Sequence, residues 1–164
     1  MAMVLNVFEP AVLALGDALR VRGTMLATAE SCTGGLIAAA CTAVAGSSDW
    51  FERGFVTYSN AAKTELLGVD AALIQAHGAV SAEVASAMAE GALAHSKAGL
   101  AVAVTGIAGP GGAVPGKPVG TVWFALACRD QAATAELLQL GGDRTAVREQ
   151  TVAHALKRLL EALS

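Results

Sequence analysis

A serine and a cysteine stand side by side where a short apolar segment ends, at Ser31 and Cys32. Residues 25–28 have the pattern of a buried strand, and residues 34–44 carry apolar side chains at helical spacing. Backbone amides at the start of a helix lack partners within the helix and favour negative charge. This turn could therefore hold a phosphate, or stabilise an oxyanion beside a nucleophilic hydroxyl. The alternative is that Ser31 only caps the helix, because serine is among the preferred N-cap residues.

Lys63 is the second residue that could do chemistry. Asn60 is expected to cap a helix over residues 61–67, which places Lys63 in the first turn, where the helix dipole opposes a positive charge. If Lys63 is also buried, its pKa falls, and a neutral lysine can act as the base that a serine hydroxyl needs. Ser31 and Lys63 thus predict a Ser-Lys dyad, with a solvated surface lysine as the alternative. Tyr58 is the only tyrosine; it either assists Lys63 or the substrate, or is a half-buried strand residue.

A glycine-dense loop is expected over residues 106–118, directly after a buried strand over residues 100–104. Glycine lets the main chain approach a ligand closely, so this loop could cradle a phosphate or a ribose. The loop lacks the GxxxxGK[ST] pattern, and no helix follows its glycines. Neither nucleotide-binding fingerprint therefore applies to it.

Arg144 and Arg148 stand at the beginning of the last predicted helix, over residues 144–163. A cation gains nothing from the helix dipole at this end, so an anion-binding role would explain the position of Arg144. Arginine suits the bidentate recognition of phosphate. Surface ion pairs with Asp143 or Glu149 are the alternative.

Metal and thiol chemistry receive little support from the sequence. The three histidines form no HxxxH or HExxH pattern, so no metal site is expected. The three cysteines form no CxxC pair, which argues against a disulfide framework. Cys32 lies at a helix terminus that could lower its pKa, but no histidine stands near it in the sequence to activate it.

The elements that must position these residues alternate between strands and helices. Further strands are expected over residues 54–59, 119–127 and 132–140, and further helices over residues 10–21 and 81–96. Gly23, Gly68, Ser81 and Asp143 are expected to mark helix ends. The pattern predicts an α/β fold over residues 1–164, a single domain with a mixed, mostly parallel sheet covered by helices on both faces, in three α/β/α layers.

Composition limits the classes of function. The net charge of −3 and the absence of a basic stripe argue against a nucleic-acid partner. Hydrophobic residues make up 54% of the 164 residues, but no apolar run is long enough to span a membrane, and no secretory signal is seen. We therefore expect a cytoplasmic protein. The high apolar fraction of so short a chain also favours a homo-oligomer, a dimer or larger.

Eight motifs follow one another along nearly the whole chain. They are Thr28-Ala29-Glu30-Ser31-Cys32-Thr33-Gly34-Gly35, Gly46-Ser47-Ser48, Val56-Thr57-Tyr58-Ser59-Asn60, Lys63, Leu67-Gly68-Val69, Gly78-Ala79-Val80-Ser81, Thr105-Gly106-Ile107-Ala108-Gly109-Pro110 and Lys117-Pro118-Val119-Gly120-Thr121-Val122. In this order they resemble the CinA C-terminal domain family, and within it most closely the nicotinamide-nucleotide amidohydrolases of PncC type.

The resemblance implies hydrolysis of the carboxamide of nicotinamide mononucleotide to nicotinic acid mononucleotide and ammonia, without a metal or other cofactor. It assigns Ser31 as the nucleophile of an acyl-enzyme, Lys63 as the base, and Tyr58 as an assisting residue. The oxyanion would be held by amides around residues 33–35, or by those of Thr105 and Gly106. The residues implied to bind the small-molecule substrate are Cys32, Thr33, Gly34, Gly35, Ser48, Thr105, Gly106, Gly109, Arg144 and Arg148.

Two departures and two alternatives accompany this resemblance. Longer family members carry a further N-terminal domain resembling molybdopterin-binding proteins, for which this chain has no room, so the activity of that domain is expected to be absent. Arg53 stands where a small residue is expected. One alternative is a non-catalytic nucleotide-binding or partner module of competence or DNA-damage type. The other is an amidase for a different small carboxamide, because pocket shape sets that choice.

Overall fold

Five strands form one sheet, in the order β2-β1-β3-β4-β5. The computed structural model describes residues 5–164. The strands are β1 (Leu26–Glu30), β2 (Phe51–Val56), β3 (Leu100–Gly106), β4 (Thr121–Cys128) and β5 (Thr134–Gln139). Strand β1 pairs in parallel with β2 and β3, whereas β4 pairs antiparallel with both β3 and β5. Four strands therefore run in one direction and β4 runs in the other, which confirms the predicted mixed sheet.

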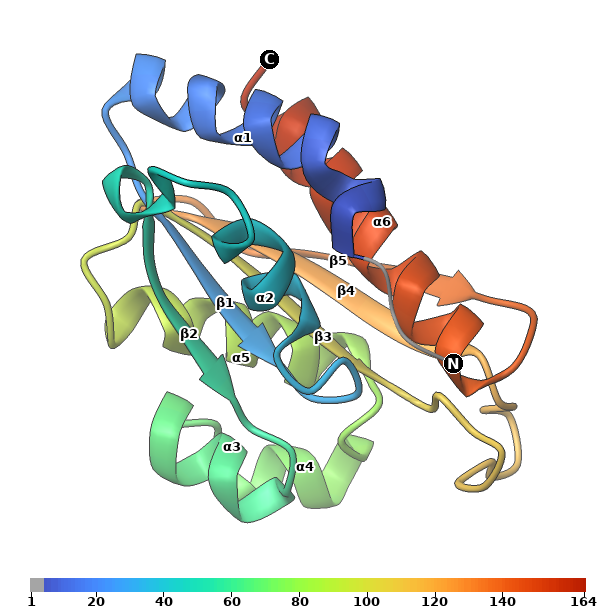
Figure 1. The fold of residues 1–164 in the computed structure, drawn as a ribbon. Coiled ribbons are helices and arrows are strands. Elements are labelled where there is room, and N and C mark those ends of the chain that lie inside the picture. The colour runs from blue at the N-terminus through green and yellow to red at the C-terminus, as the bar shows by residue number, and fades with distance from the viewer. Residues whose placement is uncertain (1–4) are drawn as a thin grey trace.

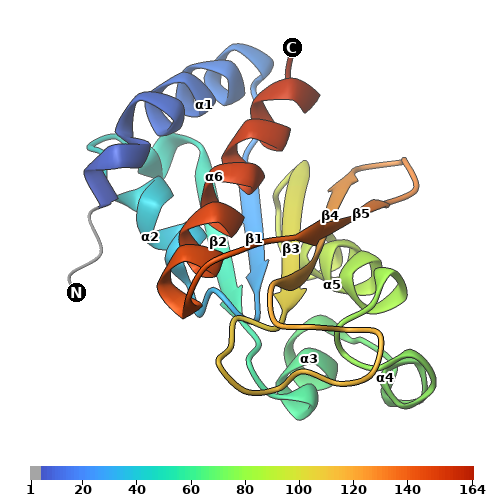
Figure 2. The same ribbon diagram turned by 90° about the vertical axis from the view of Figure 1, so that its right-hand side faces the viewer.

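Helices cover both faces of the sheet. They are α1 (Glu9–Arg22), α2 (Leu36–Thr42), α3 (Asn60–Leu67), α4 (Ala71–His77), α5 (Ala82–Ala94) and α6 (Arg144–Ala162), with 3-10 turns η1 (Leu5–Phe8) and η2 (Ser47–Asp49). Figures 1 and 2 show α1, α2 and α6 on one face, with α3, α4 and α5 on the other. The predicted three-layer α/β/α arrangement is confirmed. Within residues 5–164, no helix is both long and apolar enough to cross a bilayer.

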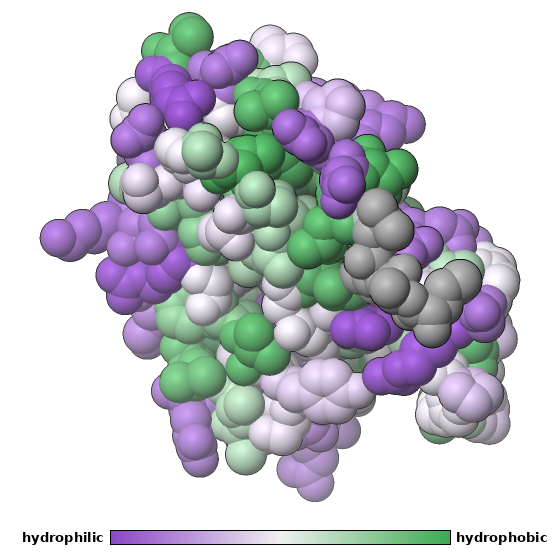
Figure 3. Space-filling model, viewed as in Figure 1, coloured by the Kyte–Doolittle hydropathy of each residue, from purple (hydrophilic) through white to green (hydrophobic). Residues whose placement is uncertain are grey.

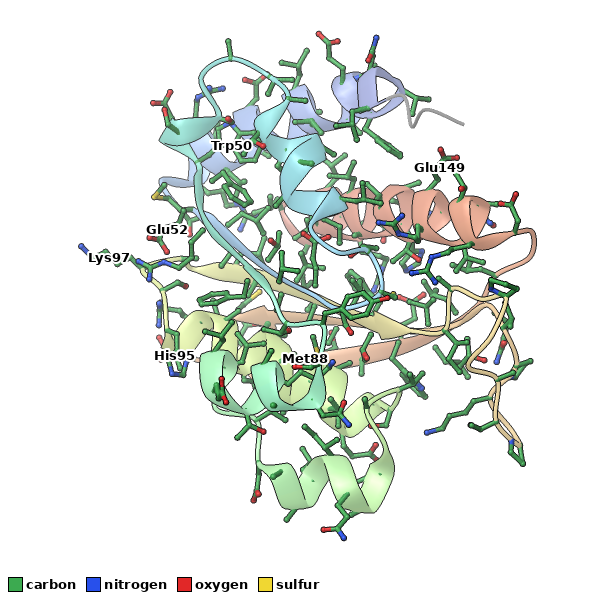
Figure 4. The ribbon with its side chains drawn as sticks, turned by 60° about the horizontal axis from the view of Figure 1, so that its bottom comes forward. Trp50, Glu52, Met88, His95, Lys97 and Glu149 are labelled. Atoms are coloured by element: carbon green, nitrogen blue, oxygen red, sulfur yellow. The ribbon has the colours of Figure 1, made fainter. Side chains whose placement is uncertain are left out.

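The two faces of the sheet differ in the size of their buried side chains. In β3, Leu100, Val102 and Val104 belong to the core beneath α1, α2 and α6, whereas Ala101 and Ala103 pack in the core with α5. This alternation is the period of two that a strand imposes. The alanine face lets α5 lie close to the sheet, and Met88 of α5 is fully buried against it (labelled in Figure 4).

Most predicted helix ends are confirmed. The Ser81 hydroxyl accepts a hydrogen bond from Val84 N at 3.3 Å, and the Asp143 carboxylate accepts one from Ala146 N at 2.9 Å. Gly23 and Gly68 end α1 and α3 in the left-handed conformation.

Four local predictions were wrong. Strand β2 runs over Phe51–Val56 rather than over residues 54–59. Helix α3 is capped by Ser59, whose Oγ accepts from Ala62 N at 3.0 Å, and Asn60 is the first helical residue. Helix α2 begins at Leu36 rather than at residue 34, because the chain makes a turn with Gly34 and Gly35 at positive φ before it enters the helix. Helix α4 was not expected. Its seven residues bury only Ile74, which gives too short an apolar pattern to recognise.

Arg53, the unexpected large residue, lies on the edge strand β2. It forms an ion pair with Glu52 and donates a hydrogen bond to His95 O at 3.0 Å. Figure 4 shows Glu52, His95 and Lys97 together at one end of the molecule. These contacts hold the start of β2 to the segment after α5, and Arg53 is not among the residues that line the pocket described below.

Candidate active site

The carboxyl ends of the four strands that run in the same direction lie together at one end of the sheet, which we call its carboxyl edge. Ser31 follows β1, Tyr58 follows β2, Thr105 lies at the end of β3, and Arg144 follows β5. Open α/β sheets commonly bind ligands at this edge. A pocket of about 270 Å³ opens here. It is lined by Ser31, Cys32, Tyr58, Asn60, Lys63, Ala79, Val80, Thr105, Gly106, Ile107, Ala108, Gly109, Gly111, Gly112 and Arg144.

Ser31 and Lys63 lie in contact at the base of this pocket. Lys63 Nζ is 3.1 Å from Ser31 Oγ, although the two residues are 32 positions apart in the sequence. Only 8% of Ser31 and 1% of Lys63 is exposed. Lys63 Nζ also donates hydrogen bonds to the carbonyls of Thr57 at 3.0 Å and Tyr58 at 3.2 Å. Lys63 is therefore not the solvated surface lysine that the sequence left open.

Burial lowers the pKa of Lys63, and this effect outweighs the opposing influence of the nearby Cys32. A neutral lysine amine has two N–H groups and one lone pair. The Thr57 and Tyr58 carbonyls can each accept one N–H, which leaves the lone pair directed at the Ser31 hydroxyl. The geometry thus allows Lys63 to accept a proton from Ser31.

The turn that carries Ser31 is built around a buried carboxylate, that of Glu30. Its Oε1 accepts hydrogen bonds from Thr33 Oγ1 at 2.6 Å and Ile37 N at 2.8 Å, and its Oε2 accepts one from Ala38 N at 3.0 Å. Glu30 satisfies the free amides of α2, so Ser31 is not the cap of that helix. Reasoning from sequence missed this residue, although a carboxylate that closes an apolar strand just before a helix was a usable signal.

Two groups of amides were predicted to stabilise an oxyanion, and of these only Thr105 and Gly106 line the pocket. Ser31 N donates to Val104 O at 3.0 Å, so the amide of the serine itself is already used. Ile107 N donates to Thr121 O of β4. Because hydrogen bonding alternates along an antiparallel strand, the Gly106 N–H points away from β4, toward the end of β1.

Arg144 and Tyr58 contact each other at the mouth of the pocket. Arg144 donates from Nη2 to the Tyr58 phenol oxygen at 3.1 Å and from Nη1 to Gly109 O at 2.8 Å. The Tyr58 side chain is 60% exposed, so it is not a half-buried strand residue. Tyr58 reaches Lys63 through its main-chain carbonyl and Arg144 through its phenol.

Five residues predicted to bind substrate do not line the pocket: Thr33, Gly34, Gly35, Ser48 and Arg148. Thr33 is fully buried, and its carbonyl accepts a hydrogen bond from Arg148 Nη2 at 3.1 Å. Ser48 lies in η2, which precedes β2 and so sits at the opposite edge of the sheet from the carboxyl ends.

Cys32 lines the pocket but is only 6% exposed, and burial raises the pKa of its thiol to about 11. Burial likewise raises the pKa of Cys41 to about 12. Both therefore carry almost no thiolate at neutral pH. Among residues 5–164, no cluster of three or more His, Cys, Asp or Glu side chains is arranged to hold a metal ion.

Together the fold and the pocket define a small α/β protein with a buried serine-lysine pair at the carboxyl edge of its sheet. The sequence model of the CinA C-terminal domain matches residues 9–163, and the chain belongs to the CinA C-terminal domain family.

Curated relatives of two lengths match this chain. It is 53% identical to "Nicotinamide-nucleotide amidohydrolase PncC" of Enterobacter agglomerans, over 89% of each chain. It is 59% identical to "Putative competence-damage inducible protein" of Symbiobacterium thermophilum, over 87% of this chain but only 35% of that protein. The chain therefore spans about a third of the longer relatives and most of the shorter ones.

Solved structures share the whole fold. The competence/damage inducible protein CihA from Agrobacterium tumefaciens superposes with a TM-score of 0.90 at 47% identity, covering 99% of both chains. A CinA superfamily protein from Escherichia coli superposes with a TM-score of 0.91 at 35% identity, covering 99% of this chain and 94% of that one.

Proposed function

We propose that this protein hydrolyses the carboxamide of nicotinamide mononucleotide, giving nicotinic acid mononucleotide and ammonia. The observation that carries the proposal is the 3.1 Å contact between Ser31 Oγ and the buried amine of Lys63 inside a pocket. Relatives of similar length that are named nicotinamide-nucleotide amidohydrolases support the choice of substrate. The intact serine-lysine pair favours an enzyme over a non-catalytic partner module.

The reaction begins when neutral Lys63 takes the proton of Ser31 as Oγ attacks the carboxamide carbon. The carbonyl oxygen becomes an oxyanion, for which the Gly106 N–H is the candidate donor. When the intermediate collapses, the C–N bond breaks, and the Lys63 ammonium returns its proton to the leaving nitrogen as ammonia. Lys63 then removes a proton from water, which attacks the acyl ester. As the ester bond breaks, the Lys63 ammonium returns this proton to Ser31 Oγ, and the carboxylic acid product ionises on release.

The substrate phosphate is placed against Arg144 in this proposal. Arg144 lines the mouth of the pocket, and its guanidinium is held by Gly109 O and the Tyr58 phenol rather than by a carboxylate. Its charge is therefore available for an anion. Glycines 109, 111 and 112 also line the pocket, and their main chain can approach the ribose closely.

The test measures ammonia and nicotinic acid mononucleotide released by the purified protein and by Ser31→Ala. We expect the parent to form both products in equal amounts and Ser31→Ala to lose nearly all turnover while remaining folded. Lys97→Met, at an exposed lysine, should match the parent. Release of ammonia from other carboxamides only would change the substrate and keep the chemistry. No release from any amide would overturn the proposal in favour of a partner module.

We further propose that the protein forms a homo-oligomer. Several large hydrophobic side chains are exposed, among them Val7 at 70% and Val21 at 87%. On the face in Figure 3, hydrophobic side chains are interspersed with polar ones. Light scattering tests this proposal, and a single monomeric species at working concentration would contradict it.

A further inference from the structure

We propose that Glu30 is a positioning residue, which keeps the Ser31 hydroxyl and the Lys63 amine at the distance and orientation that proton transfer needs. The inference rests on the proposed function, in which Ser31 attacks and Lys63 accepts the proton. Glu30 is fully buried and lies next to Ser31 in the chain, but it does not line the pocket. It acts through Ser31 and Lys63, not on the substrate.

The side chain of Glu30 fixes the path of the chain on the nucleophile side. Its carboxylate binds Thr33 Oγ1, Ile37 N and Ala38 N at 2.6, 2.8 and 3.0 Å. These three donors lie on both sides of the two-glycine bend at residues 34–35, where φ is positive. Glycine is the most permissive residue, so the bend needs an external restraint to adopt one path. The Glu30 carboxylate supplies that restraint.

The main chain of Glu30 fixes the base side. Glu30 O accepts a hydrogen bond from Thr57 N at 2.9 Å, which extends the pairing of β1 and β2 beyond the end of β2. The carbonyls of Thr57 and Tyr58 are the two acceptors that hold Lys63 Nζ. Glu30 therefore joins the segment that orients Lys63 to the turn that carries Ser31.

Thr33 is held from two directions. Its hydroxyl donates to Glu30, and its carbonyl accepts from Arg148 Nη2 at 3.1 Å. Arg148 is thus linked through Thr33 to the hydrogen bonds of Glu30. These contacts explain why Thr33 and Arg148 do not line the pocket. The three groups that face the carboxylate are all donors, so an amide cannot replace it without opposing one N–H to another.

The test compares Glu30→Gln and Thr33→Val with the parent, and with Thr33→Ser, which keeps the hydroxyl. We expect kcat for nicotinamide mononucleotide to fall by about 100-fold in Glu30→Gln while KM changes by less than about threefold, because a misplaced nucleophile slows chemistry and leaves binding intact. Thr33→Val should lower kcat in the same direction, and Thr33→Ser should restore it. The rate at which a fluorophosphonate probe labels Ser31 should fall in parallel with kcat.

Ala40→Gly is the matched control, because it destabilises α2 by about 1–2 kcal/mol, through lost helix propensity and a lost buried methyl group, without touching the hydrogen bonds of Glu30. It should keep the kcat of the parent. The inference fails if the loss of kcat in each variant, Ala40→Gly included, is proportional to its loss of unfolding free energy. It also fails if Glu30→Gln keeps full kcat. If Glu30→Gln does not fold, the two Thr33 variants decide the question. If the parent releases no ammonia from any amide, the proposed function fails instead. If Ser31→Ala remains active, Ser31 is not the nucleophile. Neither result is the kcat pattern that contradicts the role of Glu30, so the failures are distinguishable.

Discussion

Replacing Lys63 tests the chemistry most directly, because its amine is expected to work only when neutral. Burial lowers the pKa of Lys63 below the ordinary value of 10.5. Below that lowered pKa, kcat/KM should fall about tenfold for each pH unit, since one proton blocks the one free lone pair. Lys63→Arg remains charged at every accessible pH and should be inactive throughout. Lys63→Met also lacks a base and should be inactive.

The stability of Lys63→Met gives an independent check on the same pKa. Loss of the Lys63 amine leaves the Thr57 and Tyr58 carbonyls without a hydrogen-bond donor, which lowers the free energy of unfolding by about 1–3 kcal/mol for each carbonyl. In the opposite direction, at pH values below the lowered pKa the variant removes the cost of burying a charge, about 1.4 kcal/mol for each unit by which the pKa is lowered. These effects oppose each other, so we expect Lys63→Met to stay folded.

The sign of the pH effect follows from linkage. The folded state loses the Lys63 proton at a lower pH than the unfolded chain does. The parent should therefore gain stability relative to Lys63→Met as the pH rises from the lowered pKa toward 10.5. Ammonia release between pH 6 and 10 and urea unfolding over the same range measure both effects. A flat kcat/KM profile, together with a stability difference that does not change with pH, would refute the reasoning.

Three further predictions concern the rest of the pocket. Arg144→Ala should raise KM for nicotinamide mononucleotide by about 10–100-fold, the equivalent of a charge-assisted hydrogen bond, and should change turnover of the unphosphorylated riboside little; equal losses on both substrates would contradict phosphate binding. Gly106→Ala should destabilise the protein by about 1–3 kcal/mol in urea unfolding, because a Cβ would lie 2.7 Å from Val122 Cγ2 and 2.8 Å from Thr121 O. Unchanged stability would contradict this prediction and show that β4 can shift to make room for the methyl group. Cys32→Ala should keep kcat within about a few-fold, because a thiol with a pKa of about 11 is almost wholly protonated at pH 7; inactivation of a folded variant would point to the thiol.

The sequence was sufficient to predict features that depend on residues close together in the chain. Ser81 and Asp143 cap their helices as predicted, because a capping side chain binds amides only a few residues away. The pairing of Ser31 with Lys63 was predicted from the residue types, a serine after a strand and a lysine in the first turn of a helix. The family resemblance strengthened that prediction. The parallel pairing of β1 with β2, which brings the two residues together, was not predicted.

Features that depend on the path of the chain could not be predicted. The partners of Glu30 include amides seven and eight residues later, and they reach it only because the turn folds back. Ser48 was predicted to bind the substrate that Ser31 attacks, but Ser48 precedes a strand and Ser31 follows one, so the two residues lie at opposite ends of the strands. Thr33 and Arg148 are polar like substrate ligands, and only their mutual hydrogen bond shows their structural role.

The four connections that form the pocket divide between two halves of the sheet. Ser31 and Lys63 come from the connections after β1 and β2, whereas the glycine loop and Arg144 come from those after β3 and β5. Hydrogen bonds join the halves, among them those from Arg144 to Tyr58 and from Arg148 to Thr33, and neither of these two involves Ser31 Oγ or Lys63 Nζ. Insertions or exchanges after β3 and β5 could redirect such a domain to new amides while the reacting pair is inherited unchanged. A change of substrate would then appear as sequence changes after β3 and β5, and a loss of catalysis as replacement of Ser31 or Lys63.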